Sequence, residues 1–515
     1  MFLLFTKVSP KLKVKYLLIH YLSFTKTVVP HFKKTDKMTI IKTIFFTIIA
    51  VFVQGIAFSQ NSIITNEIVL NKQQAIEDYN ILYSSLINYH PNPFLYVAEN
   101  EFKAYYETQK SNIPDSLSEL EFHYLSRQLI SQIKCGHTSA KPSKEWYASV
   151  SGKNVQLPFE VKNIENRLFI SNTIDDTFQF NINDELISIN NIKVADILQK
   201  MSLMQERDGF TESLSNALIE KRFRSYFLFI MGVQSEYLIE YKTNSGEIKR
   251  ITVLPTNKKY KEIKKTELPS NFRKIIENSW SSLSFDYTTN LAYLKIDNFS
   301  DRKEFKKYYQ SVFEFLKQKD KAKLIIDLRD NPGGDFRNGN NFLTYLTPNK
   351  FELNFQKPKK RETENEYIGL SKWVKWTKVA FALKPSKHKV KGQTSETFTY
   401  KPGKYLFKGK VNVITNGITF SQAALVAAHL NENGAVFFGQ ETGGAEIGCN
   451  GILNFELVLP NSAIVVTVPM YQVKSNSTKG QFGYGVKPIY PILPIVDNSI
   501  DNTLAEVIKV ITNEK

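Results

Sequence analysis

Two apolar segments that each run into a polar turn constrain this chain most. The first is Leu324-Ile-Ile-Asp-Leu-Arg-Asp-Asn-Pro-Gly-Gly334, and the second is Thr415-Asn-Gly-Ile-Thr-Phe-Ser421, followed by an Ala/Leu-rich run. The second segment predicts a strand, a turn and a helix, with Ser421 in the first helical turn. Free N–H groups and partial positive charge at a helix N-terminus favour an oxyanion, and a Gly-Gly turn lets backbone approach a carbonyl closely. This arrangement is typical of a nucleophilic serine.

Ser421 also has a second interpretation, because serine is a favoured helix N-cap residue. Thr419 lies two residues earlier in the same turn and is a decoy for the nucleophile. The local pattern alone leaves catalysis and capping equally open, so the wider sequence has to decide between them.

The two segments resemble, in order and spacing, the core of the tail-specific (C-terminal processing) serine protease family. That family includes tricorn protease core domains and the interphotoreceptor retinoid-binding protein repeats. The resemblance covers about residues 72 to 495. It implies that Ser421 is the nucleophile and that the oxyanion is held by the backbone N–H of Gln422 and that of Gly333 or Gly334.

The resemblance implies two alternatives for the general base. The bacterial processing branch uses a lysine downstream of the serine, but the corresponding turn here, Gly439-Gln-Glu-Thr-Gly-Gly-Ala-Glu446, contains none. The tricorn-like branch uses a histidine from the N-terminal region. Lys134-Cys-Gly-His137-Thr falls at the matching place, so His137 is the predicted base.

This chain departs from the tricorn-like branch at two places. Gly136 stands where that branch has a serine, and no acid occurs between Glu456 and Asp497, where a relay glutamate is expected. A neutral group could hold the imidazole tautomer instead. The alternatives are Gln481, Thr138 and a backbone carbonyl.

The fold class expected is α/β with several domains. An apolar helical stripe predicts an N-terminal helical region at 60–150, short strands predict a β-rich domain at 151–255, and alternating strands and helices predict an α/β domain at 256–515. The family resemblance implies that this last domain is the catalytic one, of the ClpP/crotonase-like type. Within it, residues 351–405 are interpreted as a lid or rim over the site.

The middle domain resembles a PDZ domain. The segment from Asn181 to Val194 is similar to the PDZ signature, with Asn183 and Asn191 in place of its two glycines. Because asparagine tolerates positive φ better than other non-glycine residues, both turns are expected to survive.

The segment 38–59 has the layout of a secretory signal peptide: a short basic start, an apolar run and small residues before Gln60. Cleavage after Ser59 is expected, which implies a periplasmic or extracellular protein. Retention of 43–58 as an anchor is the alternative, although this run is short for a bilayer span. Residues 1–37 are interpreted as an extension from a translation start placed too early.

The net charge of +17 falls to +9 without residues 1–59, which hold nine basic residues and one acidic residue. The lysine-rich stretches lack interleaved aromatic residues, so no nucleic-acid partner is expected. No metal-ligand spacing or phosphate loop occurs, and neither a metal nor a cofactor is expected. The expected partner is a peptide or an unfolded protein substrate, and after signal cleavage no stable membrane span is expected.

Cys135 and Cys449 are the two cysteines of the chain. Both flank the predicted site, and an even count in an exported chain favours a disulfide between them. Two buried free thiols are the alternative.

Together the patterns predict a secreted or periplasmic serine endopeptidase that works through an acyl-enzyme on Ser421. A pseudo-protease of the same fold that binds peptides or apolar ligands is the alternative, and the missing relay acid favours it.

Overall fold

The computed structural model describes residues 68–174, 180–258, 268–357, 368–369, 388–390, 393–475, 477–496 and 501–513. The predicted signal peptide, the extension before it and most of the predicted lid lie outside these residues. Among the described residues, no helix combines the length and the hydrophobicity that a membrane-crossing segment needs.

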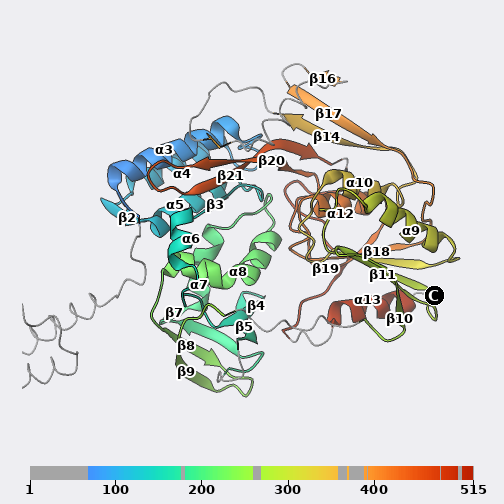
Figure 1. Ribbon diagram of the computed structural model, residues 1–515, viewed down its shortest axis with the longest axis horizontal. Helices are drawn as coiled ribbons and strands as arrows, with labels where there is room; N and C mark the ends of the chain where they lie inside the picture. The colour runs from blue at the N-terminus through green and yellow to red at the C-terminus, as the bar shows by residue number, and fades with distance from the viewer. Residues whose placement is uncertain are drawn as a thin grey trace, which may run out of the picture. The chain divides into compact units, whose positions relative to one another are not determined.

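The N-terminal region is helical, as predicted, and it packs on a hairpin from the far end of the chain (Figure 1). Asn71 and Ser118 each cap a helix through a reciprocal capping box. The elements are β1 (Val69–Asn71), α3 (Lys72–Tyr89), α4 (Glu99–Ser111), β2 (Ser116–Ser118), α5 (Glu119–Gln132), β3 (Ser139–Lys141) and α6 (Lys144–Val150).

The segment with the PDZ-like signature forms a sheet of order β4-β5-β6-β8-β9, with β7 beside β6, covered by two helices. Asn183 and Asn191 have φ of 78° and 63°, so both substitute for glycine as predicted. The elements are β4 (Phe159–Ile164), β5 (Arg167–Thr173), β6 (Glu185–Ile189), β7 (Ile192–Lys193), α7 (Val194–Leu203), α8 (Ser213–Met231), β8 (Tyr237–Lys242) and β9 (Ile248–Val253).

A seven-stranded sheet of order β10-β11-β12-β13-β18-β19-β22 carries the two motifs, and its strands run parallel from β12 onward. Helices α9, α10 and α12 pack on one face, and α13 packs on the other. The elements are β10 (Phe272–Glu277), β11 (Ser281–Asp286), β12 (Leu291–Ile296), α9 (Phe305–Lys317), β13 (Lys323–Asp327), α10 (Phe336–Leu343), β18 (Val411–Thr415), α12 (Gln422–Glu432), β19 (Val436–Gly439), β22 (Tyr490–Pro491) and α13 (Asn502–Asn513).

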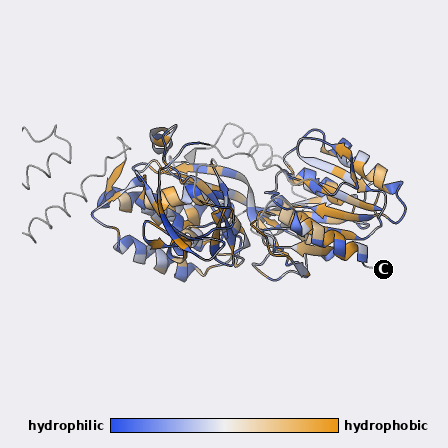
Figure 2. Ribbon diagram, turned by 90° about the horizontal axis from the view of Figure 1, so that it is seen from below, coloured by the Kyte–Doolittle hydropathy of each residue, from blue (hydrophilic) through white to orange (hydrophobic). Residues whose placement is uncertain are grey.

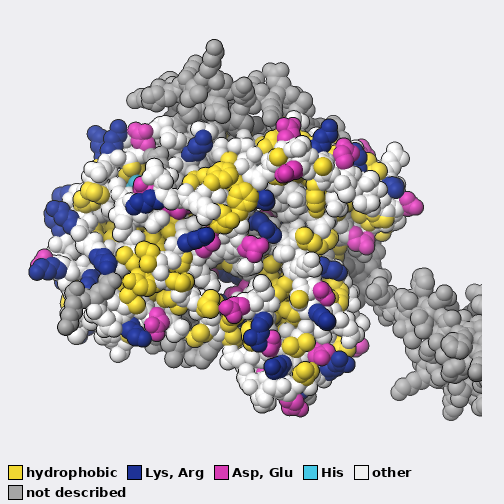
Figure 3. All heavy atoms as spheres, turned by 180° about the vertical axis from the view of Figure 1, so that it is seen from behind, with side chains coloured by type: hydrophobic (Ala, Val, Ile, Leu, Met, Phe, Trp, Pro, Cys, Tyr) yellow, Lys and Arg dark blue, Asp and Glu magenta, His cyan; other side chains and the backbone are white. Residues whose placement is uncertain are grey.

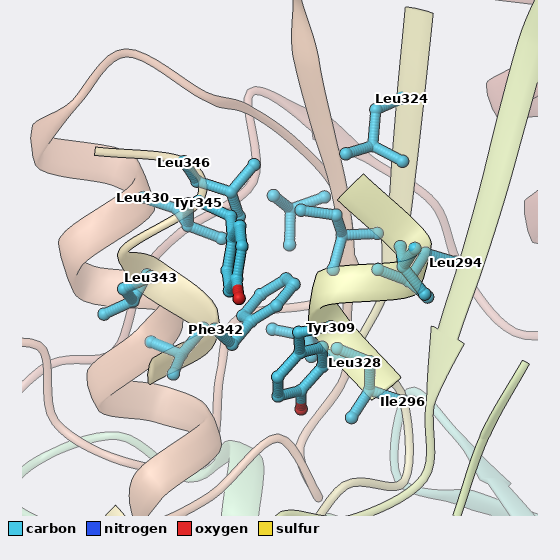
Figure 4. Close-up of a cluster of buried hydrophobic side chains, with 14 of the residues drawn as sticks. Leu294, Ile296, Tyr309, Leu324, Leu328, Phe342, Leu343, Tyr345, Leu346 and Leu430 are labelled. Atoms are coloured by element: carbon cyan, nitrogen blue, oxygen red, sulfur yellow. The ribbon is translucent and has the colours of Figure 1, made fainter. Parts of the chain in front are cut away.

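The largest core lies between this sheet and its three covering helices. Leu294 of β12, Tyr309 of α9 and Phe342 of α10 meet there, together with Leu324 and Leu430 (Figure 4). Burying each such side chain contributes about 1.5–3 kcal/mol relative to leaving it in water. This core fixes the ends of β13 and β18, from which both motif turns start.

A second sheet joins the two ends of the chain. Strands β20 and β21 form an antiparallel hairpin, and the N-terminal strand β3 pairs with β21 through Ala140 and Val466. The sheet has the order β15-β20-β21-β14-β17-β16, with β3 alongside β21. Its other elements are β14 (Phe351–Lys357), β15 (Ile368–Gly369), β16 (His388–Val390), β17 (Gln393–Tyr400), β20 (Gly448–Val458) and β21 (Val465–Lys474).

Hydrophobic residues gather on the strands and on the inner sides of the helices (Figure 2). On the face drawn in Figure 3, basic and acidic side chains are interspersed rather than gathered by sign. Several of the chain's surface charges are paired, for example Lys274 with Glu277 and Arg250 with Glu240. Exposed pairs of this kind contribute little to stability.

Candidate active site

Ser421 lies at the junction between the β18 turn and helix α12. It is the N-cap residue of α12 and has φ of 54° and ψ of −123°. A non-glycine residue in this region is strained, and such strain clusters at functional sites. Its side chain makes no capping hydrogen bond, so the capping interpretation of Ser421 is not supported. A strained serine between a strand and a helix has its hydroxyl presented for chemistry.

The side chain of Thr419 has a structural role in the turn. The side chain is fully buried, its Oγ1 donates to the Leu328 carbonyl at 2.8 Å, and it accepts from the Asn416 N–H at 3.1 Å. The hydroxyl therefore joins the β18 turn to the end of β13.

The Asn-Pro-Gly-Gly turn, which follows β13, is hydrogen-bonded to the Ser421 turn, which follows the neighbouring strand β18. Asn331 is fully buried, its carbonyl accepts from the Phe420 N–H at 3.1 Å, and its Nδ2 donates to Ile296 O at 2.9 Å. Further back, Arg329 bridges Asp327 and Asp501 with contacts of 2.6 Å to each. These hydrogen bonds and ion pairs hold the two segments in place, with Gly333 and Gly334 beside Ser421.

Gly333 and Gly334 differ in what their N–H groups do. The Gly333 N–H donates to Asn331 Oδ1 at 2.9 Å, whereas the N–H groups of Gly334 and Gln422 have no hydrogen-bond partner among the described residues. Gly333, at φ of 97°, has to be glycine, because a Cβ there would lie 2.7 Å from the Gln422 N and 2.8 Å from the Ser421 Cβ. Of the two alternatives for the second oxyanion donor, the geometry therefore favours Gly334.

His137 reaches Ser421 from the N-terminal region. It lies in the turn between α5 and β3, and the pairing of β3 with β21 holds that turn at the site. Its Nε2 is 2.9 Å from Ser421 Oγ, and its ring lies against Phe420 with the centroids 4.6 Å apart. The structure thus brings the predicted nucleophile and the predicted base into hydrogen-bond contact.

Phe420 explains why glycine precedes the histidine. A Cβ on Gly136 would lie 2.6 Å from the Phe420 ring. The serine that the tricorn-like branch has at this position therefore does not fit in this chain, where an aromatic ring occupies the space.

Burial lowers the pKa of His137 to about 4, and the main-chain carbonyl of Asn450 partly opposes this by raising it. The imidazole is therefore neutral at pH 7 and can accept a proton from Ser421. A Cβ on Gly451, next to Asn450, would lie 3.2 Å from His137 Nε2, so the imidazole packs closely against this strand.

No carboxylate among the described residues is hydrogen-bonded to His137 Nδ1. Nδ1 has no hydrogen-bond partner within the described part of the chain, and neither has Thr138 Oγ1. Gln481 is exposed, which argues against it as the orienting group. Of the three neutral alternatives, the Asn450 carbonyl is the one whose effect reaches the imidazole. Sequence patterns cannot find a main-chain carbonyl, because every residue has one.

Other candidate bases lie elsewhere. Lys479 is exposed, and its Nζ donates to the carbonyls of Asn431 and Glu432 at the far end of α12 from Ser421. His123 Nε2 contacts Ala140 O, and His429 Nε2 contacts Thr347 Oγ1. These contacts are structural. His90 Nδ1 accepts from the Asn92 N–H at 3.3 Å, so among the histidines whose side chains are described, His137 is the one that contacts Ser421.

The predicted disulfide is wrong for this structure, in which Cys135 and Cys449 are both free and buried. Burial raises the pKa of Cys135 to about 12 and raises that of Cys449 as well. Cys135 Sγ instead donates to the Asn450 carbonyl at 3.5 Å. The two residues do flank the site as expected, but the Cys135 thiol is directed to a main-chain acceptor.

A polar cavity of about 880 Å³ opens at the carboxyl ends of β12, β13 and β18, and neither Ser421 nor His137 lines it. Several of its charged side chains are paired with one another, as Lys295 is with Asp327 and Lys221 with Asp330. No cluster of three or more potential metal ligands occurs among the described residues.

Residues 290–492 match peptidase family S41, and residues 153–265 match the PDZ domain family. The S41 match supports a serine-type peptidase. Ser421, Gly333 and Gly334 lie within the matched residues, whereas His137 lies outside them.

The fold of the chain is similar to that of solved structures. Mature CPAF complexed with lactacystin matches with a TM-score of 0.59 and 13% identity, over 86% of this chain and 98% of that chain. Mature CPAF matches with a TM-score of 0.58 and 13% identity, over 86% and 96% of the two chains. At this identity the likeness concerns the fold. No curated protein matches the chain significantly in sequence.

Proposed function

We propose that this protein is an exported serine endopeptidase of the tail-specific type that cleaves peptides or unfolded proteins through an acyl-enzyme on Ser421. The observation that carries the proposal is the 2.9 Å contact between His137 Nε2 and Ser421 Oγ, made by two residues 284 positions apart. A nucleophile and a base within hydrogen-bond reach are the signature of covalent catalysis by serine.

The chemistry follows from this contact. Neutral His137 takes the Ser421 proton while Oγ attacks the scissile carbonyl, and it then gives that proton to the leaving amine. A water molecule, activated by the same imidazole, hydrolyses the acyl-enzyme. The oxyanion formed in each half-reaction would lie between the Gly334 and Gln422 N–H groups, at the positive end of α12.

The PDZ domain match supports a polypeptide substrate, because PDZ domains bind extended peptides by adding a strand to a sheet edge. Export rests on the signal-like segment 38–59. Intact-mass analysis of protein recovered from outside the cytoplasm tests it: a chain beginning at Gln60 is expected, and one that retains 43–58 would indicate an anchor.

A fluorophosphonate probe tests the catalytic proposal directly. With the chain from residue 60, peptide mapping should find the adduct on Ser421, with no adduct in Ser421→Ala and labelling slowed by orders of magnitude in His137→Ala. Lys479→Ala is the matched control, and its labelling should equal that of the wild type. Equal labelling of His137→Ala and the wild type would remove His137 from the mechanism.

A non-catalytic binder of the same fold is the second candidate. The absence of a carboxylate on His137 Nδ1 favours it. The same experiment decides between the two functions, since a binder would leave Ser421 unlabelled in the wild type.

A further inference from the structure

Asp208 lies in the connection between α7 and α8, which belongs to the segment that matches a PDZ domain. Its side chain is fully buried. The two residues after it are anchored on both sides, because the Gly209 N–H donates to Lys134 O at 3.0 Å and the Phe210 N–H donates to Gly483 O at 2.6 Å. The middle domain therefore inserts a carboxyl group beside the histidine turn.

The carboxyl of Asp208 is shared by two turns. Its Oδ2 accepts from the Ala445 N–H at 3.1 Å, and the Gly136 N–H lies close enough to lower its pKa. Its Oδ1 has no partner among the described residues. A buried carboxyl that interacts with the main-chain N–H groups of two separate segments helps to fix those segments relative to each other.

Each of these turns lies next to one member of the proposed catalytic pair. Gly136 immediately precedes His137. Ala445 ends the turn of Gly443 and Gly444, in which the Gly443 N–H donates to Thr419 O at 3.0 Å. A Cβ on Gly444 would lie 3.3 Å from the Ser421 N, so this turn packs directly against the nucleophile.

We propose that Asp208 is a positioning residue that holds the His137 and Ser421 turns together and supplies the negative charge that the absent relay acid provides in related enzymes. This inference rests on the proposed function. It assigns to the middle domain a direct part in the catalytic geometry. The charge acts through the Gly136 peptide, one residue from the imidazole that becomes positive during proton transfer.

The effect of the Asp208 charge can be tested by changing the pH, because the groups around Asp208 titrate outside the pH range in which it ionises. Burial raises the pKa of Asp208 to about 7, although the two N–H groups oppose this. Burial, and then the charge of Asp208, raise the pKa of Tyr96, Cys135 and Cys449, which face it. Burial lowers the pKa of His137 to about 4. Within this group, Asp208 is thus the residue whose charge changes between pH 5 and 9.

The cations on the adjoining segments are directed elsewhere. Lys134 Nζ donates to Tyr96 O at 3.3 Å and lies over the Phe210 ring. Arg207 Nη1 is 3.8 Å from Glu212 Oε1. The ionised Asp208 therefore makes no described ion pair, and its charge is available to the imidazolium.

The rate of fluorophosphonate labelling between pH 5 and 9 tests the inference. In the wild type it should rise about tenfold as Asp208 ionises near pH 7, because a buried negative charge then favours the imidazolium that forms during the reaction. Asp208→Asn keeps an oxygen for the N–H groups but loses the charge. It should melt like the wild type and show no rise, whereas Asp208→Ala should be slower throughout.

Asp184→Asn is the matched control, because Asp184 is also fully buried and accepts main-chain N–H groups, but within the PDZ-like sheet. Its profile should follow that of the wild type. A wild-type profile that is flat across pH 7, or a rise that persists in Asp208→Asn, would overturn the inference. The wild-type profile decides even where a variant fails to fold. Absence of labelling in the wild type at every pH would overturn the proposed function, and this inference with it.

Discussion

The nucleophile and the base reach the same point by opposite routes. Ser421 is placed locally, by a strand, a turn and a helix that are continuous in sequence. His137 is placed by long-range contacts, namely the pairing of β3 with β21 and the packing of its ring on Phe420. In this protein, therefore, the position of the proposed nucleophile depends on a strained local turn. The position of the proposed base depends on contacts between distant parts of the chain.

Removing either member of the pair should have the largest effect. Ser421→Ala and His137→Ala are each expected to lower kcat for hydrolysis of an unfolded protein by about 10⁴-fold or more, because residues that act as one unit fail together. Steady-state proteolysis with circular dichroism as a folding control measures this. A His137 variant that keeps a tenth of wild-type activity would break the comparison, since the base would then lie elsewhere.

A substitution that displaces His137 without removing it should have the next largest effect on activity. Gly136→Ser introduces a Cβ 2.6 Å from the Phe420 ring. The histidine turn must then move, and a displacement of about 1 Å costs about 100-fold in rate. We expect kcat to fall by that factor with little change in KM.

The added variant Phe420→Leu separates a clash from a loss of folding. If the clash is the cause, the double variant should recover part of the activity of Gly136→Ser. A double variant that is slower than Gly136→Ser would assign the loss to another cause.

The pH dependence of the base should be displaced toward acid. Because burial lowers the pKa of His137 from 6.5 to about 4, the imidazole stays neutral as pH falls through 6.5. In Asp208→Asn, which lacks the expected step near pH 7, labelling of Ser421 should then lose about tenfold per pH unit only below about pH 4. If the labelling rate of this variant halved near pH 6.5, in protein that circular dichroism shows to be folded, the lowered pKa of His137 would be contradicted.

Removing the buried hydroxyl of Thr419, in the turn that leads to Ser421, should have the smallest effect on catalysis. Thr419→Ala removes the hydrogen bond to the Leu328 carbonyl inside the core. We expect the free energy of unfolding to fall by about 1–3 kcal/mol, with kcat within a few-fold of the wild type at a permissive temperature. Chemical denaturation and probe labelling measure the two separately. Loss of labelling in folded protein would give Thr419 a role beyond the turn.

The local features of this fold could be predicted from sequence. Alternating apolar runs gave the strands, the capping pattern at Ser118 gave a helix start, and asparagines at positions 183 and 191 substitute for glycine as expected. Each depends on residues within a few positions of one another. The contact between Ser421 and His137 was expected only through resemblance to a family.

The rest of the site could not be predicted because it depends on main-chain groups and on packing. The Asn450 carbonyl and the N–H groups around Asp208 carry no sequence signature. Phe420, which excludes a serine at position 136, reads in sequence as an ordinary turn residue. The sequence correctly predicted that both cysteines lie near the site, but it did not predict the direction of their thiols. That direction decides whether two neighbouring cysteines can form a disulfide.

The pairing of β3 with β21 also sets the order in which this site can come into being during synthesis. The ribosome makes His137 early, but residues 465–467, which pair with β3, come after Ser421. A chain that has grown to residue 420 thus carries the base without its nucleophile and without the strand that holds it. Proteolytic chemistry at this site has to wait until almost the entire polypeptide has been made, which keeps the unfinished chain from cutting itself or its neighbours.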